Sequence, residues 1–115
     1  MLKKNNNPNK YNEELYIKKS INSLILFGIY SVCAKKEQCT FERLAKECFS
    51  LFPKAFSFSR YREWPDSRKL DRPLRSLRRK KLISGDPKNY FSLTKLGKQI
   101  AGEMVKTLSQ ARLKL

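Results

Sequence analysis

The sequence predicts a mainly helical domain with one small β-hairpin, and three observations lead to this fold class. Apolar residues recur every three or four positions in four separate stretches, which is the spacing of amphipathic helices. Two short strand-like runs flank a turn near residue 86, which predicts a hairpin. The chain has 115 residues, of which 40% are hydrophobic and 31% charged, as is typical of one globular domain.

The N-terminal part is expected to combine an arm with a long helix. Residues 1–11 are rich in Asn and Lys, which predicts a disordered basic arm, so the domain itself spans residues 12–115. Asn12 is a candidate cap for the first helix, which should end near residues 33–36. The face that this helix should bury carries Ile17, Ile21, Leu24, Ile25, Gly28, Ile29 and Val32.

A second helix should span residues 41–52, with Thr40 as its cap and Pro53 ending it. Residues 39–40 form a candidate short strand before it. The loop over residues 54–65 is dense in aromatic rings, namely Phe56, Phe58, Tyr61 and Trp64. We expect these rings to pin the loop onto the core, with Trp64 as a hydrophobic brace. The alternative is that the aromatic part of a polar patch stacks on unpaired bases, the patch being formed by Ser57, Ser59, Arg60, Tyr61 and Arg62.

A third helix is expected over residues 67–80, capped by Asp66 or Ser67. Its apolar positions are Leu70, Leu74 and Leu77. Pro73 lies inside this pattern, so the helix must either kink there or restart with Asp71 as a cap. The pattern does not distinguish these two possibilities.

The hairpin should consist of strand-like residues 82–84 and 90–93, joined by the turn-forming residues 85–89. Thr94 then caps a last helix. Its apolar residues recur every three or four positions and are Leu96, Ile100, Met104, Leu108, Ala111 and Leu115. The expected order is therefore helix, helix, helix, hairpin, helix.

One ordered set of residues carries a family resemblance. It runs Leu70…Leu74…Leu77-Arg78-Arg79-Lys80-Lys81-Leu82-Ile83-Ser84-Gly85 and then Tyr90-Phe91-Ser92-Leu93-Thr94-Lys95-Leu96-Gly97. This set resembles the winged helix-turn-helix family, in which a recognition helix leads through a basic turn into a hairpin wing, and a Leu-Thr-x-x-Gly segment caps the next helix. The resemblance covers residues 13–105 and implies DNA binding by a recognition helix (67–80) and a wing (82–93). The long aromatic loop and Pro73 depart from the family pattern.

The charge of the chain points to nucleic acid independently of this resemblance. Lys and Arg number 26 against 10 Asp and Glu, which gives a formal net charge of +16. The usual partners of a compact basic domain are phosphates. Between Asp66 and Lys88, nine basic residues face only three acids. The alternative is that these charges form no more than the solvated face of a helix.

The candidate nucleic-acid-binding residues are divided by position. Residues near the start of a recognition helix usually reach base edges, which makes Arg68, Lys69 and Arg72 the candidates for base contacts. The later cations are expected to anchor phosphates, and they are Arg75, Arg78, Arg79, Lys80 and Lys81. Lys88 in the hairpin turn is the candidate contact from the wing.

The expected function is therefore a sequence-specific or semi-specific DNA-binding protein of the transcriptional-regulator type. Two alternatives stay open: a winged helix that binds a protein partner within a larger assembly, and an RNA-binding module. A homodimer through the first and last helices is also expected, because flanking helices often build dimers in winged-helix proteins.

Several function classes are disfavoured by what the sequence lacks. It contains no histidine, no CxxC pair and no glycine-rich phosphate loop, so neither an enzyme nor a metal or cofactor site is expected. The cysteines, Cys33, Cys39 and Cys48, are best interpreted as buried hydrophobes in a reducing compartment. With no signal peptide or membrane span expected, the predicted location is cytoplasmic, at the nucleoid when DNA-bound.

Overall fold

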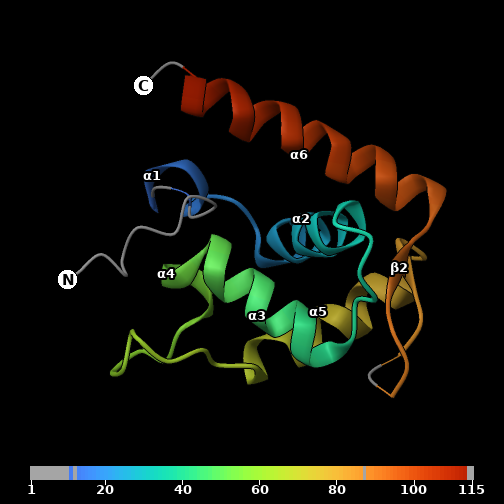
Figure 1. Cartoon of the computed structure of the whole chain (residues 1–115), viewed down its shortest axis with the longest axis horizontal. Coiled ribbons are helices and arrows are strands. Elements are labelled where there is room, and N and C mark those ends of the chain that lie inside the picture. Colours follow the sequence, from blue (N-terminus) through green and yellow to red (C-terminus); the bar gives the residue numbers. More distant parts are fainter. Residues whose placement is uncertain (1–10, 12, 87, 114–115) are drawn as a thin grey trace.

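The computed structural model of the chain describes residue 11, residues 13–86 and residues 88–113. Within these residues, helices predominate and one small antiparallel sheet is present, as the sequence predicts (Figure 1). The elements are α1 (Glu13–Tyr16), α2 (Ile21–Ala34), α3 (Phe41–Leu51), α4 (Pro53–Phe56), α5 (Arg68–Arg79), β1 (Ile83–Ser84), β2 (Ser92–Leu93) and α6 (Lys95–Leu113). Most of the predicted basic arm and the Asn12 cap lie outside the described residues.

Helix α2 lies at the centre of the molecule. It packs against α3, α5, α6 and β2, and Figure 1 shows α6 along one side of it with α3 and α5 along the other. A helix with neighbours on several sides must be apolar nearly all round. The sequence of α2 meets this requirement, since its buried residues are Leu24, Ile25, Leu26, Phe27, Gly28, Ile29 and Val32.

The prediction of one long first helix is wrong. The chain forms α1, leaves helical geometry, and restarts at α2, where the Ser20 hydroxyl accepts a hydrogen bond from the Ser23 amide at 3.1 Å. Tyr16 explains the break, because its ring is buried against Phe52 and its hydroxyl accepts the Lys54 amide hydrogen bond. Tyr11, assigned to the arm, is also buried, and its amide donates to the Leu51 carbonyl.

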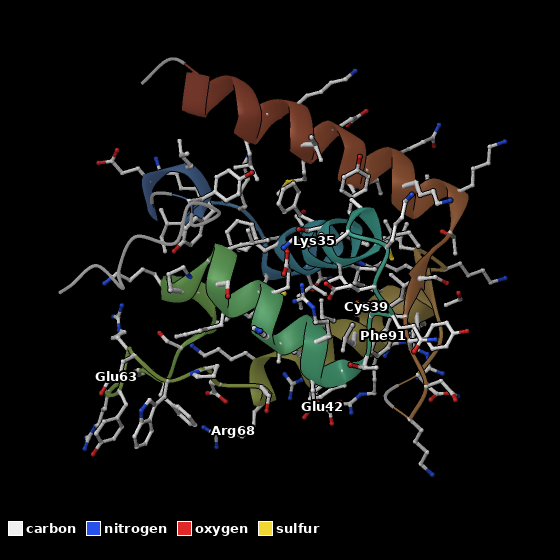
Figure 2. All side chains as sticks on the ribbon, viewed as in Figure 1. Lys35, Cys39, Glu42, Glu63, Arg68 and Phe91 are labelled. Atoms are coloured by element: carbon white, nitrogen blue, oxygen red, sulfur yellow. The ribbon has the colours of Figure 1, made fainter. Side chains whose placement is uncertain are left out.

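The second helix is confirmed, and the short strand expected at residues 39–40 is reduced to one bridge residue, Cys39. Thr40 caps α3 by accepting the Arg43 amide hydrogen bond at 3.1 Å. Cys39 forms an isolated antiparallel bridge with Phe91, whose amide donates to the Cys39 carbonyl at 2.8 Å (Figure 2). The expectation of a continuous loop after α3 is wrong at its start, because Pro53 opens the short helix α4.

The third helix, the hairpin and the last helix are also confirmed within a residue or two. Helix α5 runs through Pro73 without a restart at Asp71, which decides between the alternatives that the sequence left open. Strands β1 and β2 pair with Ile83 opposite Leu93, and the hydroxyls of Ser84 and Ser92 lie 2.7 Å apart.

Five residues expected in the core are exposed instead, and one of them is Tyr61. The other four are Ile17, Cys33, Trp64 and Leu96. Ile17 follows the end of α1, where the helical period that assigned it inward no longer applies. The described apolar residues of α6 that are buried, Ala101, Met104 and Leu108, pack within this chain. The side chains of Ala111 and Leu115 lie outside the described part of α6. The homodimer through the first and last helices stays a prediction.

Helices α2 and α3 approach closely at Gly28. A Cβ atom placed on Gly28 would lie 2.7 Å from the Cys48 sulfur and 3.3 Å from a methyl carbon of Leu44. Cys48 is fully buried, and this burial raises the pKa of its thiol well above the ordinary value. The glycine thus sets the spacing between the two helices, and the sulfur fills the space that a side chain would need.

A buried carboxylate also joins the two helices. Glu47 on α3 is only 3% exposed. It accepts hydrogen bonds from the Ser31 hydroxyl, from the Lys35 ammonium at 2.9 Å and from the Arg43 guanidinium at 2.8 Å. Burial pushes the pKa of Glu47 upward, but these three hydrogen bonds outweigh it, so the pKa lies below its ordinary value.

We expect Gly28→Ala to lower the free energy of unfolding by about 1–3 kcal/mol, the typical cost of an extra methyl group in a filled core. Because Cys48 causes the clash, the Gly28→Ala/Cys48→Ala double variant should be more stable than the sum of the single changes. Gly102→Ala is the control, since its Cβ would meet no atom within 4 Å, and it should stabilise α6. Urea denaturation measures the free energy of unfolding of Gly28→Ala, Cys48→Ala, the double variant and the control. Strictly additive free-energy changes in the double variant would refute the proposed clash.

We expect Glu47→Gln to lower the free energy of unfolding at pH 7 by about 2 kcal/mol, because hydrogen bonds to an ionised group are lost. The pKa of Glu47 is lower in the folded state, so its contribution is complete above the unfolded value of about 4.3 and is lost as the pH falls through the folded value. Urea denaturation at pH 7 and pH 3 should show the difference between wild type and variant shrinking at pH 3. Glu42→Gln, an exposed change on the same helix, should have little effect at either pH.

Candidate nucleic-acid interface

Helix α5 has two opposite faces. Its buried face carries Leu70, Leu74 and Leu77. With about 100° of rotation per residue, four exposed arginines fall within about 60° of one another on the opposite face. They are Arg68, Arg72, Arg75 and Arg79, which we call the arginine stripe. The leucines bind the helix to the core, so the arginines must face solvent.

The arginine stripe is largely free of acidic partners. Among the described residues, the acids that form ion pairs are Glu37, Glu47 and Asp66, and only Arg68 of the stripe takes part. Asp71 is exposed on the same helix beside the stripe and makes no ion pair with a described residue. The guanidinium groups of the other three stripe arginines are therefore available to an external anion.

Two of the three residues predicted to contact bases have bonds within the chain. The Arg68 guanidinium donates to Asp66 at 3.0 and 3.3 Å and lies 5.2 Å from the centre of the Phe58 ring. Its side chain is nevertheless 76% exposed. The Lys69 ammonium donates to the Ser57 carbonyl at 2.7 Å. Of the three, only Arg72 makes no such bond to the described residues.

Asp66 organises the start of α5. It is buried, and its carboxylate accepts hydrogen bonds from both the side chain and the backbone amide of Arg68. The hydrogen bond from the Arg68 guanidinium is the main reason why the pKa of Asp66 lies below its ordinary value. Of the two predicted caps, Ser67 stands at the N-cap position without a side-chain hydrogen bond. Asp66 supplies the bond that Ser67 does not.

The basic turn after α5 has a defined backbone conformation. The Lys81 amide donates to the Arg78 carbonyl and the Leu82 amide to the Leu77 carbonyl, both at 3.0 Å. This pair of bonds is a Schellman motif, which requires a left-handed residue and usually uses glycine. Lys81 occupies that position with φ 61°. The turn thus places exposed Lys80 and Lys81 next to the arginine stripe.

The start of α6 is attached directly to this turn. The Thr94 hydroxyl lies 2.8 Å from the Lys81 carbonyl oxygen and 3.0 Å from that of Leu82, and it accepts the Gly97 amide hydrogen bond. A Cβ on Gly97 would lie 2.1 Å from the Leu82 oxygen, so only glycine fits there. The Leu-Thr-x-x-Gly segment therefore fastens α6 to the end of α5.

The hairpin turn is held by a carboxylate. The Asp86 side chain accepts hydrogen bonds from the amides of Lys88 and Asn89, at 2.9 and 3.1 Å. The Lys88 bond is the main reason why the pKa of Asp86 lies below its ordinary value, and the charge of Arg78 lowers it further. Gly85 has φ 103°, and a Cβ there would lie 2.1 Å from the Tyr90 oxygen. Lys88 is exposed on this turn, while Pro87 lies outside the described residues.

All the predicted site residues except Lys88 thus lie on one continuous segment. Arg68 to Lys81 follow a single helix and its terminal turn, whereas Lys88 belongs to the hairpin turn. The sequence predicted Asp66 as a cap but not its bond to the Arg68 guanidinium, and it assigned Tyr61 and Trp64 to the core. Both rings are exposed on the loop before α5. The Arg60-Tyr61-Arg62 run, where aromatic and cationic residues alternate, was the signal that favoured an exposed site.

Comparison of the chain with known protein families, with curated proteins and with solved structures finds no match. No described helix has the length and apolar character needed to cross a membrane. Within the described residues, no group of three or more His, Cys, Asp or Glu side chains could hold a metal ion.

We expect Lys81→Gly to raise the free energy of unfolding by about 1 kcal/mol, because glycine adopts the left-handed conformation without the Cβ penalty. Lys81→Ala is the control, since it removes the same charge but keeps the penalty. Lys36, which ends α2 with φ 61°, offers a second instance, and Lys36→Gly should stabilise similarly. Thermal unfolding checks the set; an equal gain from Lys81→Ala would attribute the effect to charge instead.

Proposed function

We propose that the chain is a winged-helix protein that binds duplex DNA, with α5 as the recognition helix and the β1–β2 hairpin as the wing. The observation that carries the proposal is the arginine stripe, exposed along one face of α5 and mostly without acidic partners among the described residues. Nine cations on α5, its terminal turn and the hairpin form one basic segment, as expected of a surface that meets a phosphate backbone.

The order of elements supports a winged-helix assignment. Helix α2, the Cys39 bridge, helices α3 and α5, the hairpin and α6 follow one another in the order of that fold. Cys39 pairs with Phe91, the residue just before β2, and so adds a single bridge beside the two-stranded sheet. The hydrogen bond from the Thr94 hydroxyl to the Lys81 carbonyl fastens the hairpin and α6 to the end of α5. Phe91 and Thr94 belong to the set of residues that carries the resemblance noted from the sequence.

The dimensions of α5 suit a DNA groove. From Arg68 to Arg79 the helix rises about 16 Å, and the major groove of B-DNA, about 12 Å wide, admits an α-helix. Guanidinium forks can bind phosphate or guanine bidentately. We assign base contacts first to Arg72, because Arg68 and Lys69 are bonded to Asp66 and Ser57. Arg75, Arg79 and the Lys80–Lys81 turn are assigned to phosphates, and Lys88 to the backbone beside the wing.

Within this proposal, the biological role is transcriptional regulation. A helix that places several exposed arginines against one groove can combine base contacts with phosphate contacts, which specific regulators require. RNA binding and a protein-assembly role are the outcomes that the binding experiments below would reveal instead.

We expect Arg72→Ala and Arg75→Ala each to weaken binding to a DNA duplex several-fold and to reduce the slope of log affinity against log salt concentration by about one per lost phosphate contact. Fluorescence anisotropy with a labelled duplex at several salt concentrations measures both quantities. Lys106→Ala on the exposed face of α6 is the charge-matched control and should change neither. Unchanged affinity in both arginine variants would refute the α5 interface, and tighter binding of structured RNA would redirect it.

We expect Lys81→Gly to weaken duplex binding although it stabilises the fold. Lys36→Gly removes the same charge from an equivalent backbone position at the end of α2, and its affinity should be close to that of the wild type. Because both proteins should be at least as stable as the wild type, unfolding cannot explain a difference. Equal losses of affinity in the two variants would indicate that only the total charge matters.

A further inference from the structure

The loop between α4 and α5 exposes two large aromatic rings. Tyr61 is 55% exposed and Trp64 57% exposed. Their ring centres lie 5.5 Å apart with 24° between the planes, so the rings stack on each other. Neither ring is buried in the core, although a tryptophan in a small domain normally contributes its apolar area to the core. We call residues 57–65 the aromatic loop.

The aromatic loop has a defined conformation. Ser57 and Pro65 form an antiparallel bridge, the Phe58 amide donates to the Trp64 carbonyl at 3.1 Å, and the Trp64 amide donates to the Tyr61 carbonyl at 3.0 Å. These bonds form a small hairpin, with Tyr61 toward its tip and Trp64 on its second arm. The Tyr61–Trp64 stack is thus presented by an organised backbone, which lowers the entropy cost of binding another planar group.

The aromatic loop is also attached to the start of α5. Lys69 donates to the Ser57 carbonyl, and the Arg68 guanidinium lies over the Phe58 ring. Figure 1 shows the loop projecting beside the first turn of α5, and Figure 2 shows Glu63 on it, at the same side of the molecule as Arg68. A ligand that follows the arginine stripe toward the N-terminus of α5 would therefore reach this loop.

The surroundings of the rings are charged and mostly basic. Arg60 and Arg62 flank Tyr61 and are exposed, and Glu63 is the only acid of the aromatic loop. Asp66, the next acid along the chain, is bonded to Arg68. Stacked aromatic rings beside cations are the elements with which proteins bind single-stranded nucleic acid, the rings stacking on bases and the cations meeting phosphates.

We propose that the Tyr61–Trp64 stack binds an unpaired nucleobase, so that the protein prefers a duplex bordered by a single strand over a fully paired duplex. The inference rests on the proposed function of α5, because the duplex part of the ligand is held by the arginine stripe. The base continues the ring stack on the outer face of one ring, and Arg60 and Arg62 meet the adjoining phosphates.

The test compares a blunt DNA duplex with the same duplex carrying a short single-stranded tail at either its 3′ or its 5′ end. The wild type should bind one tailed duplex about tenfold more tightly than the blunt one, which is within the range of base–aromatic stacking. Trp64 is the only tryptophan of the chain, so its fluorescence reports directly on the site. The tailed duplex should quench this fluorescence, and the blunt duplex should not.

Tyr61→Ala and Trp64→Ala should abolish the preference for the tail and leave blunt-duplex affinity unchanged. Both rings are exposed, so the variants should fold, and thermal unfolding verifies this. Tyr90→Ala is the matched control, because Tyr90 is 52% exposed on the hairpin and should retain the preference. Trp64→Phe should retain part of it. A DNA tail and an RNA tail of equal sequence distinguish the two sources of the unpaired base.

The results separate the two proposals. Equal affinity for blunt and tailed duplexes, with no quenching of Trp64, overturns the stacking site while leaving α5 binding intact. Failure to bind any duplex, with quenching by a single strand alone, overturns the α5 proposal and supports the stacking site. Quenching by both blunt and tailed duplexes overturns the preference for an unpaired base.

Discussion

The burial of α2 on several sides is the constraint on which the rest of the structure depends. Helices α3, α5 and α6 and strand β2 all pack on it, and its residues from Leu24 to Ile29 are buried without interruption. Each neighbour must therefore offer α2 an apolar face. In α5 that face is the row of leucines, and the helical period then directs the arginine stripe to the opposite side. The outward direction of the charges thus follows from the packing of the core.

Three acids of this strongly basic chain, Glu47, Asp66 and Asp86, are bonded within the fold, and basic residues remain the majority on the outer face of α5. Glu47 holds Lys35 and Arg43 between α2 and α3, where an unpaired buried charge would be costly. Asp86 binds backbone amides within the hairpin turn. Asp66 neutralises part of Arg68 but also positions it over Phe58. Mutual repulsion within the remaining stripe opposes folding, and a polyanion would relieve it.

Local rules of the sequence predicted the helices α3, α5 and α6 and the hairpin, because caps such as Thr40 and Thr94 and regular apolar spacing act over a few residues. The break between α1 and α2 was missed, since the burial of Tyr16 against Phe52 is a long-range contact that no local pattern contains. The path of α5 through Pro73 was undecidable for the same reason: the leucine row against the core outweighs one lost backbone bond. At the candidate site, the spacing of the arginines could be predicted from the sequence. The bonds from Lys69 to Ser57 and from Arg68 to Asp66 could not.

The long connection between α3 and α5 departs from a tight helix-turn-helix, in which three or four residues join the helices. Here the chain uses the additional residues to form α4 and the aromatic loop. Phe56 and Ser57 are buried, and Lys69 ties the loop to α5, so the insertion does not loosen the packing of the helix. Residues 59–65, which include Tyr61 and Trp64, are exposed. An insertion that is anchored by Ser57 and exposed over these residues extends the surface of α5 beyond its N-terminus.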